Sequence, residues 1–291
     1  MGNRRRATSE LDPTNQRVVI SKSRDTPILS PIASPAPGAS ITAGTAVTVT
    51  GTATDTDGHV GGVEVSADGG QTWHPAAGRN QWSYAFVANK ASGPLALKSR
   101  ASDDSGNIET AGPGITITIT PRPCPCTIFE NATPTTTDSG SGTPVEVGMK
   151  FRADTSGTIN GIRFYKATAN TGPHTVNLWT ANGSLLATAI SGAETGSGWQ
   201  QANFATPVAV TAGTLYVASY RTTTGHVADD KWYSTYPPEF FQPTGVDNTP
   251  VHMADPLGPD GPSVFTNGGP GTFPTQASLD ENYWIDVVFA P

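Results

Sequence analysis

Short runs of alternating apolar and polar residues, closed by glycine, proline or asparagine, recur along most of this chain. The clearest are "INGIRFYK", residues 159–166, and "TLYVASY", residues 214–220. A period of two places successive side chains on opposite faces of a β-strand. No window keeps an apolar period of 3.6 residues over three helical turns, and no run of apolar residues is long enough for a membrane-spanning helix. The pattern therefore predicts an all-β chain without a membrane span.

The number of turns and the chain length together predict two β-sandwiches in series. The chain has 291 residues with 32 glycines and 25 prolines, and only 14% of its residues are charged. Between residues 28 and 121 the alternating runs follow one another with Gly, Asp and Asn turns between them, which is typical of a sandwich of roughly 100 residues. The second half carries a further set of strands and the hairpin signal Asn182-Gly183 between two apolar runs.

The boundaries follow from shifts in composition. Residues 1–27 are polar and basic and are expected to be a flexible lead-in, in which "RVVIS", Arg17 to Ser21, could pair as a single strand. Residues 28–121 form the first sandwich, 122–127 a Pro/Cys linker and 128–291 the second sandwich. Residues 221–280 lack clear alternation, and we interpret them as a long insertion of the kind that usually carries function.

The two cysteines, Cys124 and Cys126, lie within the linker. Side chains two residues apart rarely reach the geometry of an unstrained disulfide. A zinc site needs about four ligands, and no second Cys or His pair has a suitable spacing. The pair is interpreted as part of the linker or of a strand start, with a strained bridge left open.

The distribution of charge excludes one class of partner. The net charge is −7, and residues 124–291 contain six Lys and Arg against fourteen Asp and Glu, a balance of −8. Phosphate-backbone binding needs clustered positive charge, so nucleic acid is not expected as a partner. Few lysines, abundant Thr, Ser and Gly, and an acidic surface fit a secreted or cell-surface bacterial protein, although "MGNRRRATSE" is not followed by the apolar stretch of a signal peptide.

Both halves resemble known bacterial families. "VEVGMKFRAD", "GTINGIRFYK", "ETGSGWQQANF", "PVAVTAGTLYVASY" and "FPTQASLDENYWIDVVF" are similar, in this order, to the bacterial family of domain of unknown function 4082. Its members are modules of large secreted proteins, beside Ig-like sandwiches and catalytic domains, and no established activity comes with them. We expect this second half to fold as a jelly-roll-like sandwich. "DDKWYSTYPPEFFQPTGVD" departs from the family in length and in its Pro and aromatic content.

The first half resembles a different kind of module. "TVTGTATDTDGHVGGVEVSADGGQTWHPA" and "SRASDDSGNIE" are similar to the immunoglobulin-like modules of secreted bacterial multidomain enzymes and to the dimerising sandwich of molybdenum-cofactor sulfite oxidases. The turn Asp68-Gly69-Gly70 suits positive φ, and Trp73 is expected on the core face of the following strand. Asp55, Asp57 and Asp104 are either turn-capping residues or calcium ligands at one end of this sandwich.

The second half contains residues suited to binding a sugar. Flat aromatic rings stack on the apolar faces of pyranoses, and neighbouring polar side chains bond their hydroxyls. "HVADDKWYSTYPPEFF", residues 226–241, concentrates such residues, and the "TGPH" turn is expected to lie against it. The predicted ligand-binding residues are His174, Gln200, Tyr220, His226, Trp232, Tyr233 and Tyr236. For the aromatic residues among them, packing of the loop against the sandwich remains the alternative interpretation.

Other kinds of site have weaker support. Asp229, Asp230 and Asp247 supply enough oxygen ligands for a calcium ion, without an EF-hand-like spacing. The five histidines form no metal-binding pattern, and the "GxSxG" nucleophile elbow is absent. A glycosidase needs two carboxylates flanking one bond. The candidates for that role are Glu146, Asp154, Glu194, Asp229, Asp230, Asp247 and Asp286.

These observations support a non-catalytic extracellular binding module, with a polysaccharide or glycan ligand, appended to a larger protein and a neighbouring catalytic domain. The alternative is a structural module that docks against another domain or a second copy. A groove lined by Trp232 and Tyr236 favours the first hypothesis. A flat apolar face above about 800 Å² per partner favours the second.

Overall fold

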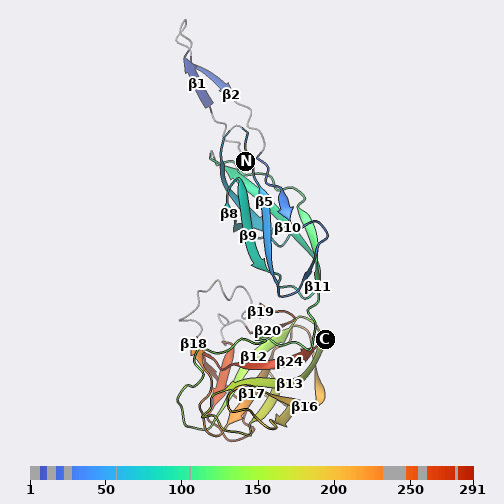
Figure 1. Ribbon diagram of the computed structural model, residues 1–291, viewed down its shortest axis with the longest axis vertical. Helices are drawn as coiled ribbons and strands as arrows, with labels where there is room; N and C mark the ends of the chain where they lie inside the picture. Colours follow the sequence, from blue (N-terminus) through green and yellow to red (C-terminus); the bar gives the residue numbers. More distant parts are fainter. Residues whose placement is uncertain are drawn as a thin grey trace. The chain divides into compact units, whose positions relative to one another are not determined.

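The computed structural model describes residues 7–11, 18–22, 28–56, 58–104, 106–231, 247–254, 261–278 and 281–291. The chain divides into two compact units, the first ending at Pro121 and the second beginning at Arg122 (Figure 1). Every regular element in the described ranges is a β-strand, which confirms the all-β prediction. No helix in these ranges is long and apolar enough to cross a membrane.

A hairpin lies within the segment for which the sequence predicts a lead-in. Strand β1 (Ala7–Leu11) pairs antiparallel with β2 (Val18–Lys22). β2 largely coincides with the single strand expected from "RVVIS". Its partner is not visible in the sequence pattern, because "ATSEL" has only one large apolar residue and therefore no alternation.

The first unit is a sandwich of two sheets, with strand orders β3-β5-β9-β8 and β4-β11-β10-β6-β7. Inward-facing residues of both sheets form its core, for example Val49, Trp82 and Leu97. Its strands are β3 (Ile32–Ser34), β4 (Ser40–Thr42), β5 (Ala46–Thr52), β6 (Val60–Ser66), β7 (His74–Pro75), β8 (Ala77–Gly78), β9 (Gln81–Val87), β10 (Gly93–Asp103) and β11 (Ile115–Thr120).

The turn after β6 is held by the carboxylate of Asp68. It accepts hydrogen bonds from the backbone N–H groups of Gln71 and Thr72, at 2.8 and 2.9 Å, and from the Thr72 hydroxyl at 2.5 Å. The prediction that Trp73 returns to the core is wrong. Its ring is only partly buried, and the ring centroid lies 4.2 Å from the guanidinium carbon of Arg100, so that the tryptophan makes a cation–π contact in place of a core contact.

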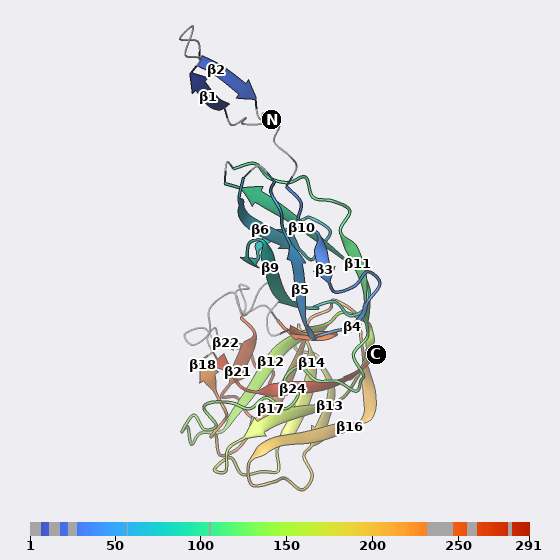
Figure 2. The same cartoon turned by 45° about the horizontal axis from the view of Figure 1, so that its top comes forward.

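The second unit has a large and a small sheet facing one another (Figures 1 and 2) and a separate antiparallel pair of short strands, β18 with β23. The large sheet has the order β15-β14-β17-β12-β20-β19, with β21 also paired to β12 and β22, and the small sheet has the order β16-β13-β24. The strands are β12 (Val145–Ala153), β13 (Gly157–Lys166), β14 (Thr175–Thr180), β15 (Leu185–Ile190), β16 (Gly198–Val210), β17 (Tyr216–Thr222), β18 (Asp230–Lys231), β19 (Asp247–Asn248), β20 (Val251–Met253), β21 (Ser263–Thr266), β22 (Gln276–Ser278), β23 (Glu281–Asn282) and β24 (Ile285–Ala290).

Both faces of β17 are buried, as its two-sided apolar pattern predicts. Tyr216 and Tyr220 face the inter-sheet core. Val217 lies on the opposite face in a small cluster with Trp179 and Phe273. Phe273 belongs to the segment between β21 and β22, which therefore covers part of the outer face of the large sheet.

The expected hairpin at Asn182-Gly183 joins β14 to β15. Gly183 has φ of 85°, and its N–H donates to the carbonyl of Thr180 at 3.0 Å. The long insertion expected between residues 221 and 280 is more regular than predicted, because β20 and β21 both add to β12. Strands of three and four residues are too short to show alternation in a sequence.

Cys124 and Cys126 form a disulfide. Cys126 also pairs with Phe289 of β24 through two backbone hydrogen bonds, at 2.8 and 2.9 Å. The carboxylate of Asp286, which is fully buried, accepts hydrogen bonds from the backbone N–H groups of Ile128 and Phe129. The start of the second unit is thereby fastened to its last strand.

Candidate functional site

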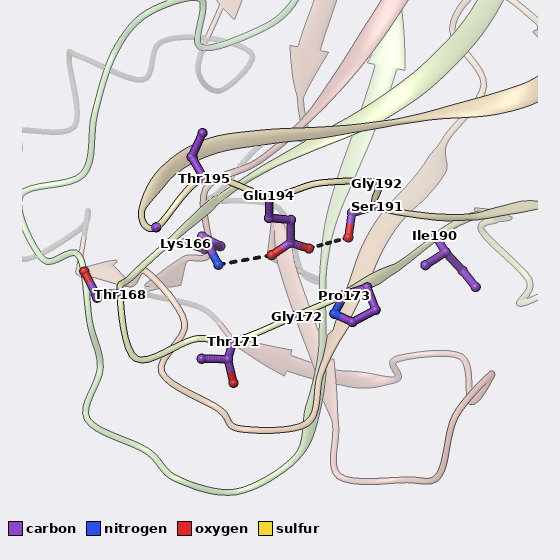
Figure 3. A pocket seen from close by; sticks show the side chains of 11 residues that line it. Lys166, Thr168, Thr171, Gly172, Pro173, Ile190, Ser191, Gly192, Glu194 and Thr195 are labelled. Carbon is purple, nitrogen blue, oxygen red and sulfur yellow. Dashed lines mark hydrogen bonds and ion pairs between the residues drawn. The ribbon is translucent and has the colours of Figure 1, made fainter.

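A pocket of about 650 Å³ opens at one edge of the second unit. It lies between the loop that joins β13 to β14 and the loop that joins β15 to β16 (Figure 3). Exposed threonines and glycines form much of its rim. The lining residues are Lys166, Thr168, Thr171, Gly172, Pro173, Ile190, Ser191, Gly192, Glu194, Thr195 and Gly196.

The floor of the pocket holds an ion pair. The Nζ atom of Lys166 lies 3.1 Å from Oε2 of Glu194, and the two side chains are only 6% and 8% exposed. Figure 3 shows the Glu194 carboxylate between Lys166 and Ser191, whose hydroxyl donates to Oε1. Lys166 also donates to the carbonyl of Asn170 at 3.0 Å. Two buried opposite charges with further hydrogen bonds form a rigid floor.

Gly172 is required where the two loops approach each other. A Cβ atom at this position would lie 2.5 Å from either carboxylate oxygen of Glu194. Any larger residue would therefore push the loops apart and displace the carboxylate from Lys166.

His174, predicted as a ligand-binding residue, lies behind the pocket wall. It is 1% exposed, with Nδ1 2.7 Å from Oε1 of Glu194 and Nε2 2.8 Å from Oδ1 of Asn170. Two facing oxygens favour the protonated ring. Burial acts the other way, and together with the positive charge of Lys166 it outweighs the attraction of Glu194 and lowers the pKa of His174.

The interactions of Glu194 have the opposite balance. Burial alone would raise the pKa of its carboxyl group. Hydrogen bonds from Ser191, His174 and Lys166, together with the charge of the histidine, lower the pKa of Glu194 below its usual range. The carboxylate is therefore ionised at neutral pH and balances the charge of Lys166.

Gln200 and Tyr220 also stand behind the pocket and do not line it. The Gln200 side chain is 6% exposed and accepts from the N–H of Thr195 at 2.9 Å while donating to its hydroxyl at 2.6 Å. It shapes the turn at the rim. Tyr220 is fully buried and stacks on Phe164 with ring centroids 4.5 Å apart. A ligand has no access to that ring. The prediction that Gln200 and Tyr220 contact a ligand directly is therefore wrong.

His226 lies on a neighbouring loop, outside the pocket lining. Its Nδ1 atom is 2.9 Å from Oδ1 of Asp138, and both side chains are partly exposed. The pKa of Asp138 is lowered by the N–H of Gly140 and by His226. The loop after β17, which carries His226, is linked to the pocket loop between β13 and β14, because the backbone N–H of Thr171 donates to the hydroxyl of Thr224 at 3.2 Å.

The predicted aromatic residues Trp232, Tyr233 and Tyr236 lie outside the described residues. For the predicted calcium ligands, the structure gives a different role to Asp230. Its carboxylate is 6% exposed and accepts from Thr135, from the N–H of Thr136 and from Nε1 of Trp284. These bonds hold the strand-free segment after the linker against the core.

Asp229 and Asp247 are the other two predicted calcium ligands. Asp229 is partly exposed, and Asp247 contributes its backbone to β19. Across the described ranges, no group of three or more His, Cys, Asp or Glu side chains is placed to hold a metal ion. In the first unit, Asp55 and Asp104 both lie beside Gly58, whereas Asp57 is outside the described residues.

Sequence reasoning missed Lys166, Asn170 and Ser191. One signal for Lys166 was available, because it follows Ile162 and Phe164 at the inward-facing positions of one strand. A lysine at such a position indicates a buried charge that needs a partner. Its partner Glu194 is in a loop 28 residues further on (194 − 166), and no local pattern joins the two.

The comparisons with known proteins agree with this two-unit all-β architecture. Residues 131–285 match the family described as "Domain of unknown function (DUF4082)", and residues 31–97 match "Bacterial Ig domain". The first match covers more than half of the chain, and the chain belongs to that family. Both resemblances and their order in the sequence are thereby confirmed. A search of the curated proteins gives no match.

Similar solved structures include three from bacteria. The endo-beta-1,4-mannanase from Thermotoga petrophila is 12% identical with a TM-score of 0.28, over 34% of this chain and 20% of that one. The sulfane dehydrogenase SoxCD from Paracoccus pantotrophus is 24% identical with a TM-score of 0.24, over 34% and 27%. The fibronectin(III)-like modules of Clostridium thermocellum CbhA are 20% identical with a TM-score of 0.25, over 33% and 99%. The chain thus spans about a quarter or less of the first two.

Proposed function

We propose that this chain is a non-catalytic accessory module of a larger secreted or cell-surface bacterial protein, and that its second unit binds a carbohydrate in the pocket above Lys166 and Glu194. The observation that carries the proposal is the composition of that pocket. The hydroxyls of Thr168, Thr171 and Thr195 stand around a charged floor, and polar groups of this kind bond sugar hydroxyls.

The shape of the pocket supports the same ligand class. Its volume of about 650 Å³ is within the range of small-molecule sites. Glycines at 172, 192 and 196 allow a ligand to approach the backbone, while Pro173 and Ile190 offer apolar surface to the C–H face of a ring. The buried side chains of His174 and Gln200 hold the two loops before a ligand arrives, which lowers the entropic cost of binding.

The environment of the acidic residues supports a role without catalysis. Glu146, Asp230 and Asp286 are buried, and each accepts hydrogen bonds from neighbouring protein groups. Glu194 is paired with Lys166. A glycosidase needs two carboxyl groups free to reach one bond, and the bonds that these residues already make do not favour that arrangement.

The proposal is tested with soluble and insoluble polysaccharides and a glycan array. Wild type is compared with Thr171→Trp/Thr195→Trp, which fills the rim, and with Thr206→Trp, which changes an exposed threonine of β16 outside the pocket lining. We expect wild type and Thr206→Trp to bind one class of glycan and the rim variant to lose at least about tenfold in affinity, 1.4 kcal/mol.

A third variant separates the pocket from the aromatic segment predicted by the sequence. Trp232→Ala/Tyr236→Ala should leave binding to the pocket intact. If only this variant loses binding, the sugar is recognised by the segment containing Trp232 and Tyr236, and the pocket assignment is wrong. Absence of binding to every glycan would contradict carbohydrate recognition itself.

A further inference from the structure

Strand β15 forms an open edge of the large sheet. Among the residues that the structure describes it pairs only with β14, and the neighbouring β16 belongs to the other sheet. The described residues contain six large apolar side chains that are exposed, and three of them lie on this one strand: Leu185 at 49%, Leu186 at 40% and Ile190 at 68%. Edge strands are usually protected by charge, proline or brevity. β15 has six residues with no charge and no proline.

The backbone of this edge is ready to pair with another strand. The N–H of Ser191 donates to the carbonyl of His174 on the β14 side. Since backbone groups alternate in direction along an antiparallel strand, those of Ala189 and Ala187 also point toward β14. The backbone groups of Thr188 and Ile190 therefore point away from the sheet, where the described structure gives them no partner strand.

The sequence of the strand suits pairing with a second copy of itself. Residues 186–190 read Leu-Ala-Thr-Ala-Ile, which is symmetric about Thr188 in residue class, with an alanine on each side of the threonine and a large aliphatic residue at each end. An antiparallel pairing of two identical strands has a two-fold axis and pairs each residue with the one equally far from the centre. Centred on Thr188, it sets Leu186 opposite Ile190 of the partner subunit.

Side-chain direction agrees with this register. Leu186, Thr188 and Ile190 are all exposed, while Ala187 and Ala189 are partly buried against the core. Two-fold pairing would thus align two Leu–Ile pairs and one Thr–Thr pair on a single face. Such cross-strand pairs stabilise sheets.

Charge does not oppose a second copy at this edge, although it does elsewhere. Residues 124–291 carry a balance of −8, so two copies repel one another over most of their surfaces. β15 has no ionisable side chain, and pairing there sets no like charges opposite each other.

We propose that β15 is a self-association edge, through which two copies of the second unit join by antiparallel pairing centred on Thr188. The two large sheets become one continuous sheet across the axis. Ile190 also lines the pocket, so the partner subunit's Leu186 would stand at its rim. This inference does not depend on the ligand of the pocket. A single strand pair buries less than a standard interface, and the dimer is expected to be weak and concentration-dependent.

Sedimentation velocity of the full chain, from low to high micromolar concentration, tests the proposal. Wild type should shift from monomer toward dimer. Thr188→Lys sets two like charges face to face at the axis and should raise the dissociation constant at least tenfold. Leu186→Lys should also weaken the dimer. Leu186→Lys/Ile190→Glu should recover it, because the introduced lysine meets the introduced glutamate of the other copy.

An independent cross-linking experiment tests the register. Thr188→Cys places two thiols opposite each other, at a Cα separation of about 5.5 Å that suits a disulfide. Thr206→Cys is the control, since Thr206 is an exposed threonine on the edge strand of the other sheet. Thr188→Cys should form a covalent dimer under mild oxidation much faster than the control.

Two results would overturn the proposal. One is a wild-type chain that stays monomeric at every concentration. The other is a dimer whose stability is unchanged by Thr188→Lys and whose cross-linking is equal in the two cysteine variants. All the substituted side chains are exposed, and thermal unfolding midpoints close to that of wild type would establish that each variant is folded.

Discussion

Lys166 and Glu194 form an ion pair, 3.1 Å between Nζ and Oε2, in which both side chains are more than nine-tenths buried although the pair lies at the floor of an open pocket. Ser191 and His174 complete the coordination of the carboxylate, and the carbonyl of Asn170 accepts from the ammonium group. The two loops that form the pocket are therefore joined by charge, and the stability of the unit depends on that junction.

Removal of one member of the pair should cost much more than removal of both. Lys166→Met leaves the Glu194 carboxylate buried without its counter-ion, and we expect the free energy of unfolding of the second unit to fall by about 3–5 kcal/mol. Lys166→Met/Glu194→Gln should lose less than the sum of the two single changes. Urea denaturation of the four proteins measures this coupling. A single variant within about 1 kcal/mol of wild type would contradict the prediction.

The second unit should lose stability in mild acid because of His174. Its pKa is lowered in the folded state, from an ordinary value of 6.5. Above that value the histidine is neutral in both states and makes no difference. As the pH falls below 6.5, the unfolded chain binds a proton first, so the folded state becomes less stable.

Thermal unfolding between pH 8 and pH 5 measures this loss. His174→Gln has no titrating ring and should show a flatter profile between pH 6.5 and 5, although its stability at pH 8 is reduced. Glu194, whose pKa is also lowered, contributes stability that is lost only below its ordinary value of 4.5. Identical pH profiles for wild type and His174→Gln above pH 5 would show that His174 is not the cause of the loss of stability.

Glu146 should behave in the opposite sense. Its side chain is fully buried on the outer face of the large sheet. There Oε1 accepts hydrogen bonds from Ser219 at 2.6 Å and from Asn177 at 2.9 Å. Burial raises the pKa of Glu146 above its ordinary value of 4.5. Because its pKa is raised in the folded state, Glu146 contributes stability to the second unit that is fully present below pH 4.5. This contribution is lost as the pH rises through the folded-state pKa.

Glu146→Gln resembles the protonated acid and does not ionise. The variant should therefore gain stability relative to wild type as the pH rises from 4.5 to 8, measured by denaturation at several pH values. Glu146→Ala is the matched control, because it also removes the charge but leaves Asn177 and Ser219 without their acceptor. A Glu146→Gln variant that becomes relatively weaker toward pH 8 would show that the carboxylate is the favoured form.

In the first unit, Asp68→Asn should loosen the turn after β6. Burial raises the pKa of Asp68, but hydrogen bonds from Ser66, Thr72 and Gln71 outweigh burial and hold it well below the ordinary value of 3.8. The stabilisation is present above 3.8 and is lost only in stronger acid. Asparagine cannot replace the two-oxygen acceptor, but water screens the exposed carboxylate, so we expect a loss of only about 0.5–1 kcal/mol at neutral pH. The free energies of unfolding of Asp68→Asn and wild type should become equal in strong acid, as measured by unfolding of the first unit.

Much of the second unit was predictable from local pattern. The alternation in "INGIRFYK" and "TLYVASY" corresponds to β13 and β17, and Asn182-Gly183 corresponds to the turn between β14 and β15. The period of a strand and the positive φ of a turn are properties of neighbouring residues. They can be recognised in a sequence without knowing which strands pair.

The buried charged cluster at the floor and back wall of the pocket was not predictable in this way. Lys166, His174 and Glu194 come from a strand end and two loops that meet only in the folded sandwich. Burial also decided between two roles for the predicted ligand residues. Tyr220 packs against Phe164 in the core, and Gln200 holds the turn at the pocket rim by hydrogen bonds to Thr195.

The sequence by itself determined the longer strands, the hairpin turn and the family, because these depend on periodicity and on short motifs. Only the tertiary structure decided which polar side chains are buried together and which edge stays open. The partner of Lys166 and the exposure of Leu186 both follow from contacts between segments far apart in the chain, and the free energy of such contacts is set by the packing of both sheets together.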